Sequence, residues 1–139
     1  MKVLALIFAL CFVGVFSELT EKKLAQLRGY RQECIEQTKV DETMIDKAKE
    51  GEWMEDDSNL QCYFSCMMKK IKVLNADGTL NEEKARKRML NDLPEDKIEG
   101  VMMKCKDMKG DTDCTTAMKL MKCYATEKAF IRLMTEKNQ

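Results

Sequence analysis

The chain has 139 residues, with 24 basic and 24 acidic side chains and no histidine. Such a balanced charge gives no electrostatic footprint for nucleic acid or for an anionic membrane. The lack of histidine excludes Ser-His and Cys-His catalytic pairs and every zinc site with a histidine ligand.

The first segment, MKVLALIFALCFVGVFS, has the pattern of a secretory signal. Lys2 precedes an apolar or small run from Val3 to Phe16, which is shorter than the ~20 residues of a membrane helix. Small residues at Val15 and Ser17 predict cleavage after Ser17. We therefore expect a signal peptide over residues 1–17 and one secreted domain over residues 18–139; the alternative is a retained short anchor. Loss of Lys2 leaves 23 basic and 24 acidic residues.

One proline, six glycines and many Lys, Glu, Met, Leu and Ala predict an all-α domain. The first three expected helices cover residues 19–38, 42–50 and 58–74. Leu24 and Leu27 have helical spacing in the first, and the second stops at Gly51. The third begins with a capping box formed by Ser58 and Gln61.

Three more helices are expected after a turn at residues 75–78, whose sequence is NADG. Thr79 and Glu82 form the capping pattern of the fourth, which ends near Asn91. Pro94 suits the first position of the fifth, which reaches Met108. The sixth runs from about residue 111 to 128.

Six of the seven cysteines remain once the signal, with Cys11, is removed. An even number in a short exported chain predicts three disulfides. A Cys₄ metal site needs close cysteine pairs, and here only Cys62 and Cys66 are close. A C-x-x-C redox motif is lacking. We therefore expect no metal and no cofactor.

Helix geometry limits the fifteen possible pairings. Cys62 and Cys66 lie one turn apart on one helix, a poor fit to disulfide geometry. Cys114 and Cys123 are roughly 13 Å apart along another helix, which is too far. Each excluded bridge occurs in three of the fifteen complete pairing schemes, and one scheme contains both excluded bridges, so ten schemes remain. In all ten, Cys62 and Cys66 bond two other segments, and their helix is the hub of the network.

The cysteine order C-x₂₇-C-x₃-C-x₃₈-C-x₈-C-x₈-C, read from Cys34 to Cys123, resembles the six-cysteine insect odorant-binding proteins. The resemblance spans essentially the whole mature chain. It implies a PBP/GOBP-like fold, a six-helix disulfide-stapled bundle around an internal apolar cavity. It also implies the bridges Cys34–Cys66, Cys62–Cys114 and Cys105–Cys123.

That family carries small apolar organic ligands, such as odorants and pheromones, through aqueous lymph toward olfactory receptors. The resemblance thus implies a secreted carrier, monomeric or weakly homodimeric, with no nucleic-acid or membrane partner. Counting from the cysteines, the ligand-binding positions would be Leu27, Trp53, Phe64, Met68, Met102, Leu120, Tyr124, Phe130 and Leu133. The alternative for each is plain core packing. Eleven methionines of the mature chain would either adapt to varied ligands or fill gaps.

This sequence differs from some members of that family in two features, its lack of histidine and its short tail. Without histidine, any pH response would come from carboxylates or lysines with shifted pKa values. The tail after Cys123 is short and ends in TEKNQ, so we expect it to wall the cavity rather than insert as a long helix.

The sequence also bears on three other functions: an enzyme, a calcium-binding loop and a different binding role for the same fold. The acidic pairs Asp56–Asp57 and Glu82–Glu83 stand at expected helix starts, where they favour the helix dipole, so we expect no enzyme. The NADG turn lacks the acids of a calcium loop. The remaining rival is a scavenger or partner-binding protein of the same fold in saliva, venom or reproductive fluid.

Overall fold

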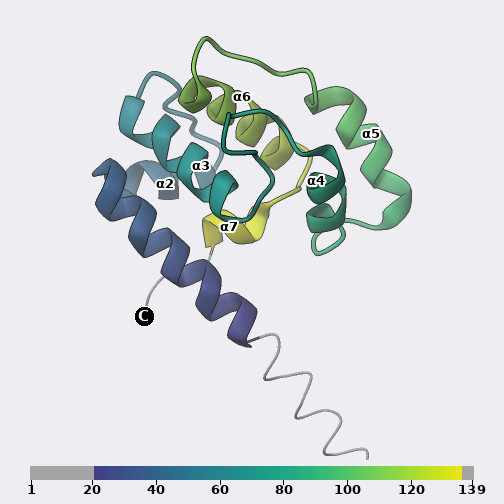
Figure 1. Ribbon diagram of the computed structural model, residues 1–139, viewed down its shortest axis with the longest axis horizontal. Coiled ribbons are helices and arrows are strands. Elements are labelled where there is room, and N and C mark those ends of the chain that lie inside the picture. Colours follow the sequence, from purple (N-terminus) through teal and green to yellow (C-terminus); the bar gives the residue numbers. More distant parts are fainter. Residues whose placement is uncertain (1–20, 136–139) are drawn as a thin grey trace, which may run out of the picture.

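The structure, a computed structural model, describes residues 21–135. This part of the chain contains seven helices (Figure 1). They are an N-terminal helix (residues 21–38), α2 (Glu42–Lys49), α3 (Ser58–Lys70), α4 (Glu82–Met89), α5 (Glu95–Cys105), α6 (Asp113–Thr126) and α7 (Ile131–Thr135). The prediction of an all-α fold is confirmed. The expected signal peptide lies outside the described residues. None of the described helices is long and apolar enough to cross a membrane.

The helices are arranged around α3 and α6, which pack on each other more extensively than any other pair among α2 to α7. Figure 1 shows α4 and α5 on one side of this pair, with α2 and the N-terminal helix on the other. The short α7 lies at the base of the bundle, where it contacts α2.

Three disulfides connect these helices. Cys34–Cys66 joins the N-terminal helix to α3, Cys62–Cys114 joins α3 to α6, and Cys105–Cys123 joins α5 to α6. These are the three bridges that the family resemblance implies. Helix α3 bonds two different segments and is the covalent hub, as predicted from its two cysteines.

Helix α3 starts where predicted but uses a different cap. The Asp57 carboxylate accepts a hydrogen bond from the Leu60 N–H at 2.9 Å. Gln61, expected to reach back to Ser58, donates instead to the Glu55 carbonyl at 2.6 Å. The predicted capping box is therefore wrong, because an aspartate one residue earlier supplies a charged acceptor to the same N–H groups.

The predicted turn at residues 75–78 is present, and Gly78 adopts a φ of +86°. Its N–H donates to the Asn75 carbonyl at 2.9 Å. Thr79 does not cap α4, because its N–H and hydroxyl both donate to Asp77. These bonds lower the pKa of the Asp77 carboxyl. Asn81 caps α4 instead, accepting from the Lys84 N–H.

Four other predicted boundaries shift by a few residues. Helix α3 ends at Lys70 rather than residue 74, because Lys72 has a φ of +68° and the next two N–H groups return to the Met68 carbonyl. Helix α5 begins just after Pro94, and it ends at Cys105 rather than Met108. Helix α6 begins at Asp113 behind a capping box of Thr112 and Thr115.

The core fills the space between α3 and α6 and extends to α2, α4, α5 and α7. Seven of its buried side chains in the described chain are methionines: Met67, Met68, Met89, Met102, Met118, Met121 and Met134. Methionine has three rotatable bonds and a polarizable sulfur, so a sizeable part of this core consists of adaptable side chains.

Candidate functional site

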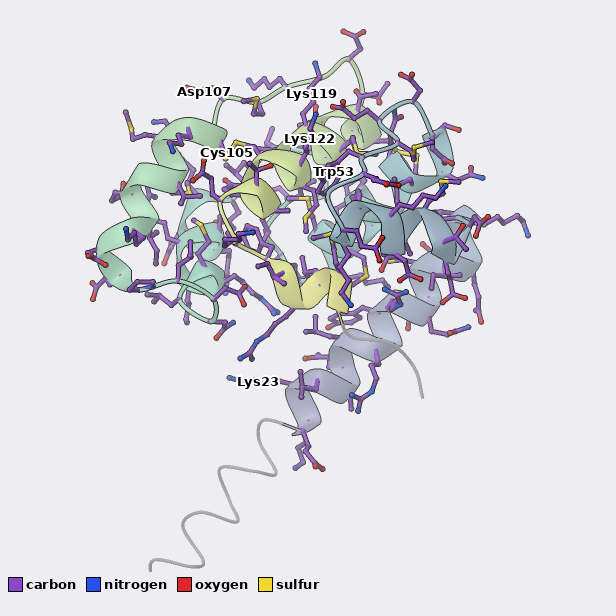
Figure 2. The ribbon with its side chains drawn as sticks, turned by 180° about the vertical axis from the view of Figure 1, so that it is seen from behind. Lys23, Trp53, Cys105, Asp107, Lys119 and Lys122 are labelled. Atoms are coloured by element: carbon purple, nitrogen blue, oxygen red, sulfur yellow. A yellow bond between two sulfur atoms is a disulfide. The ribbon has the colours of Figure 1, made fainter. Side chains whose placement is uncertain are left out.

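The nine predicted ligand-binding residues all lie in the core or against it, but the structure places them in several groups. Trp53 and Phe64 form the first, with ring centroids 5.7 Å apart. Trp53 lies in the loop before α3. Glu55 of the same loop forms an ion pair with Lys122 of α6 at 3.0 Å, which joins the loop to α6 (Figure 2). Met68, on the same helix as Phe64, is buried in the core.

Tyr124 is the centre of the second group. Its ring meets Phe130 edge-on at 4.9 Å, and its hydroxyl donates to the Met102 sulfur at 3.7 Å. Burial, together with the nearby Glu82 charge, raises the pKa of Tyr124 to about 12. A thioether is a weak acceptor, so this buried hydroxyl retains capacity for a stronger hydrogen bond.

The other predicted residues border hollows. Leu27, Phe130 and Leu133 line one of about 160 Å³ between the N-terminal helix, the end of α4 and α7. Leu120 borders a separate cleft of about 460 Å³ near the start of α6. Several acidic residues edge that cleft, yet no three His, Cys, Asp or Glu residues in the described chain are placed to hold a metal ion.

A larger hollow of about 590 Å³ adjoins the one at Leu27, and sequence reasoning missed it. We call it the basic groove; its lining is Lys23, Gln26, Leu27, Tyr30, Lys70, Ile71, Lys72, Lys84, Lys87, Arg88, Leu90 and Asn91. The signal that could have found it is helical spacing, because positions 84, 87 and 88 share one face of α4. Figure 2 labels Lys23 close to the start of the N-terminal helix.

Asp92, in the linker between α4 and α5, anchors α7. Its carboxylate lies 3.8 Å from the Arg132 side chain, and the nearby backbone N–H groups of Phe130 and Ile131 favour its charged form. The side chain is only 12% exposed, and this burial raises the pKa of the Asp92 carboxyl despite those partners. A residue distant in the sequence therefore contacts, through an ion pair, a helix that local sequence did not predict.

Asp92→Asn is expected to raise the melting temperature by a few degrees at about pH 7 and to leave it unchanged at about pH 3. A raised folded pKa means that the folded state binds the proton more tightly. The stabilisation is therefore complete below the unfolded pKa and is lost as pH rises through the folded pKa. Asparagine keeps an acceptor for the two N–H groups without the buried charge. Thermal melts of both proteins across this range check the sign. A lower melting temperature for Asp92→Asn at neutral pH would show that the Arg132 pair dominates.

A buried polar cluster was also not foreseen. Arg31 is 2% exposed, and its guanidinium lies 3.7 Å from a Glu42 carboxylate oxygen. Tyr63 is fully buried nearby, and burial raises its pKa to about 12 although the Arg31 charge acts in the opposite direction. Within the described chain, one Arg31 nitrogen and the Tyr63 hydroxyl have no hydrogen-bond partner.

Comparison with known proteins gives consistent matches. The model of the PBP/GOBP family matches residues 16–127. Odorant-binding protein 10 of Aedes aegypti is 29% identical over 126 residues, or 89% of either chain. General odorant-binding protein 56a of Drosophila melanogaster is 26% identical over 90% of this chain and 89% of its own length. Among solved structures, the fatty acid binding protein OBP56a from the oral disk of the blowfly Phormia regina is 27% identical. It has a TM-score of 0.64 and covers 78% of this chain and 93% of that one.

Proposed function

Because this chain belongs to the PBP/GOBP family of insect odorant-binding proteins, we propose that it is a secreted carrier of small hydrophobic ligands. The ligand would lie inside the helical bundle, be carried through aqueous lymph and be released near olfactory receptors. The relatives are named as binding proteins, which supports a non-catalytic role. The blowfly neighbour is titled a fatty acid binding protein, which supports an apolar cargo.

The Tyr124 hydroxyl is the observation that carries this proposal. Tyr124 is fully buried, and the partner of its hydroxyl is the Met102 sulfur rather than an oxygen. A buried hydroxyl gains by donating to a better acceptor. An alcohol, ester or carboxyl oxygen of a ligand would supply one.

The surrounding core can make room for such a ligand. Met102, Met118 and Met121 are buried around α5 and α6, and methionine rotamers adapt at low cost. We propose that ligand contacts come from the predicted set of Leu27, Trp53, Phe64, Met68, Met102, Leu120, Tyr124, Phe130 and Leu133. Adaptable walls favour a range of related ligands over a single one.

A displacement assay tests the carrier function. Delipidated, oxidised protein is loaded with a fluorescent apolar probe, and alcohols, esters, aldehydes and fatty acids compete for it. We expect displacement near micromolar concentration, about −8 kcal/mol, that is lost when the disulfides are reduced. Failure of the well-folded protein to take up any apolar probe would contradict the proposal.

Tyr124→Phe is expected to weaken binding of ligands with an oxygen acceptor by roughly fivefold, because about 1 kcal/mol of hydrogen bonding is lost. Hydrocarbon analogues of the same length should bind as before. Competition assays on both proteins, with matched alcohol and alkane pairs, measure the difference. An equal change for both ligand types would show that the hydroxyl makes no hydrogen bond to the ligand oxygen.

A further inference from the structure

The basic groove is set apart by its charge. Six of its lining residues are cations and none is acidic, although the whole chain has equal numbers of both. Lys70 is paired with Glu33 at 2.6 Å. Among the described residues, the other five cations have no ion-pair partner. The groove therefore presents a surplus of positive charge that an anion would neutralise.

The floor of the groove is apolar and leads inward. Leu27, Tyr30 and Ile71 form part of its lining, and Leu27 and Ile71 also border the hollow at Phe130 and Leu133. Lys23, Arg88 and Asn91 border both hollows as well. An apolar chain lying on this floor would run from a cationic rim toward the core.

Arg88 stands at the junction of the two hollows. It is half-buried, and burial lowers the pKa of its guanidinium because the charged form has lost water without gaining a carboxylate. The nearby acid, Asp92, is already engaged with α7 and Arg132. Arg88 is thus recessed and electrostatically unsatisfied, unlike the lysines on the rim.

We propose that the basic groove binds the carboxylate of a long-chain fatty acid anion, with Arg88 on the head group and Leu27, Ile71, Phe130 and Leu133 along the chain. This inference rests on the proposed carrier function and names its ligand class and head-group site. A guanidinium fork matches a carboxylate with two parallel hydrogen bonds. The recessed position of Arg88 favours a single amphiphile over a membrane surface, which would meet the rim lysines first. The volume of about 590 Å³ falls within the roughly 300–1,000 Å³ of ligand pockets.

The test compares dodecanoate with dodecanol, which has the same chain and no charge. Calorimetric titration below the micellar concentration is done with wild type, Arg88→Met and Lys97→Met. Lys97 is an exposed residue of α5 outside the groove, so its variant controls for net charge. We expect Arg88→Met to weaken dodecanoate binding by at least about tenfold and dodecanol binding by less than about twofold. Lys97→Met should change neither.

Two further measurements make the outcome specific. Arg88→Lys keeps the charge but loses the fork, so it should give an intermediate loss for dodecanoate. The carbon-13 signal of carboxyl-labelled dodecanoate should report a lower bound pKa in wild type than in Arg88→Met.

Each remaining outcome has a distinct meaning. Binding of dodecanol with no advantage for dodecanoate, or an equal loss of both in Arg88→Met, would overturn the head-group site alone. Binding of neither ligand to wild type would overturn the carrier function itself. Arg88-dependent sedimentation with phosphatidylserine vesicles, alongside unchanged dodecanoate binding in Arg88→Met, would reassign the groove to a lipid surface.

Discussion

Replacing both Cys62 and Cys114 with alanine is expected to lower the free energy of unfolding by about 4 kcal/mol. The bridge closes a loop of 52 residues, against 32 for Cys34–Cys66 and 18 for Cys105–Cys123. A longer loop removes more conformational freedom from the unfolded chain. This bridge also joins α3 to α6, the most extensively packed pair among α2 to α7.

Urea unfolding of the three double-cysteine variants, each with its two remaining bridges oxidised, measures these costs. The Cys105 and Cys123 variant is the matched control, with an expected cost of about 3 kcal/mol. If that variant proves the least stable of the three, loop length does not set the order. The strain or packing at each bridge would then have to explain it.

Phe64→Ala is expected to destabilise the protein by about 3–5 kcal/mol. The Phe64 ring is 2% exposed and lies 5.7 Å from Trp53 and 5.6 Å from Tyr63, measured between ring centroids. Its removal would leave a cavity between two other aromatic rings. Trp53 is the only tryptophan of the chain, so its fluorescence reports this change directly.

Phe64→Leu serves as the control, because it keeps most of the apolar volume and should cost less than about 1.5 kcal/mol. Chemical unfolding followed by Trp53 fluorescence gives both values. A cost below about 1 kcal/mol for Phe64→Ala would mean that the ring faces empty space in the free protein. Phe64 would then be part of a cavity wall rather than of a packed core.

The features that the sequence predicted are those that depend on short stretches of chain. The NADG turn and the stop of α2 at Gly51 follow from local backbone preferences, although the turn lies outside the helices on either side of it. The caps were predicted less well, because Asp57 and Asn81 compete with Ser58 and Thr79 for the same N–H groups. Neighbouring residues with similar chemistry leave the choice to the tertiary structure.

The features that the sequence did not reveal depend on residues far apart in the chain. Helix α7 is joined to Asp92 by an ion pair, and the basic groove needs the N-terminal helix, the end of α3 and α4 together. Arg31 is buried although arginine is usually exposed. The predicted ligand-binding residues, which were counted from the cysteines, do lie in or against the core. Their positions in the sequence did not show which of them line the same hollow.

The three disulfide loops overlap along the chain, since residues 62–66 lie in the first two and residues 105–114 lie in the last two. Every peptide bond between Cys34 and Cys123 is therefore spanned by at least one bridge. A single proteolytic nick at the exposed residues 75–77, or anywhere else in this range, leaves both fragments in one covalent molecule. Two cuts within one loop are needed to release a peptide, so the protein tolerates one cleavage without losing any of its parts.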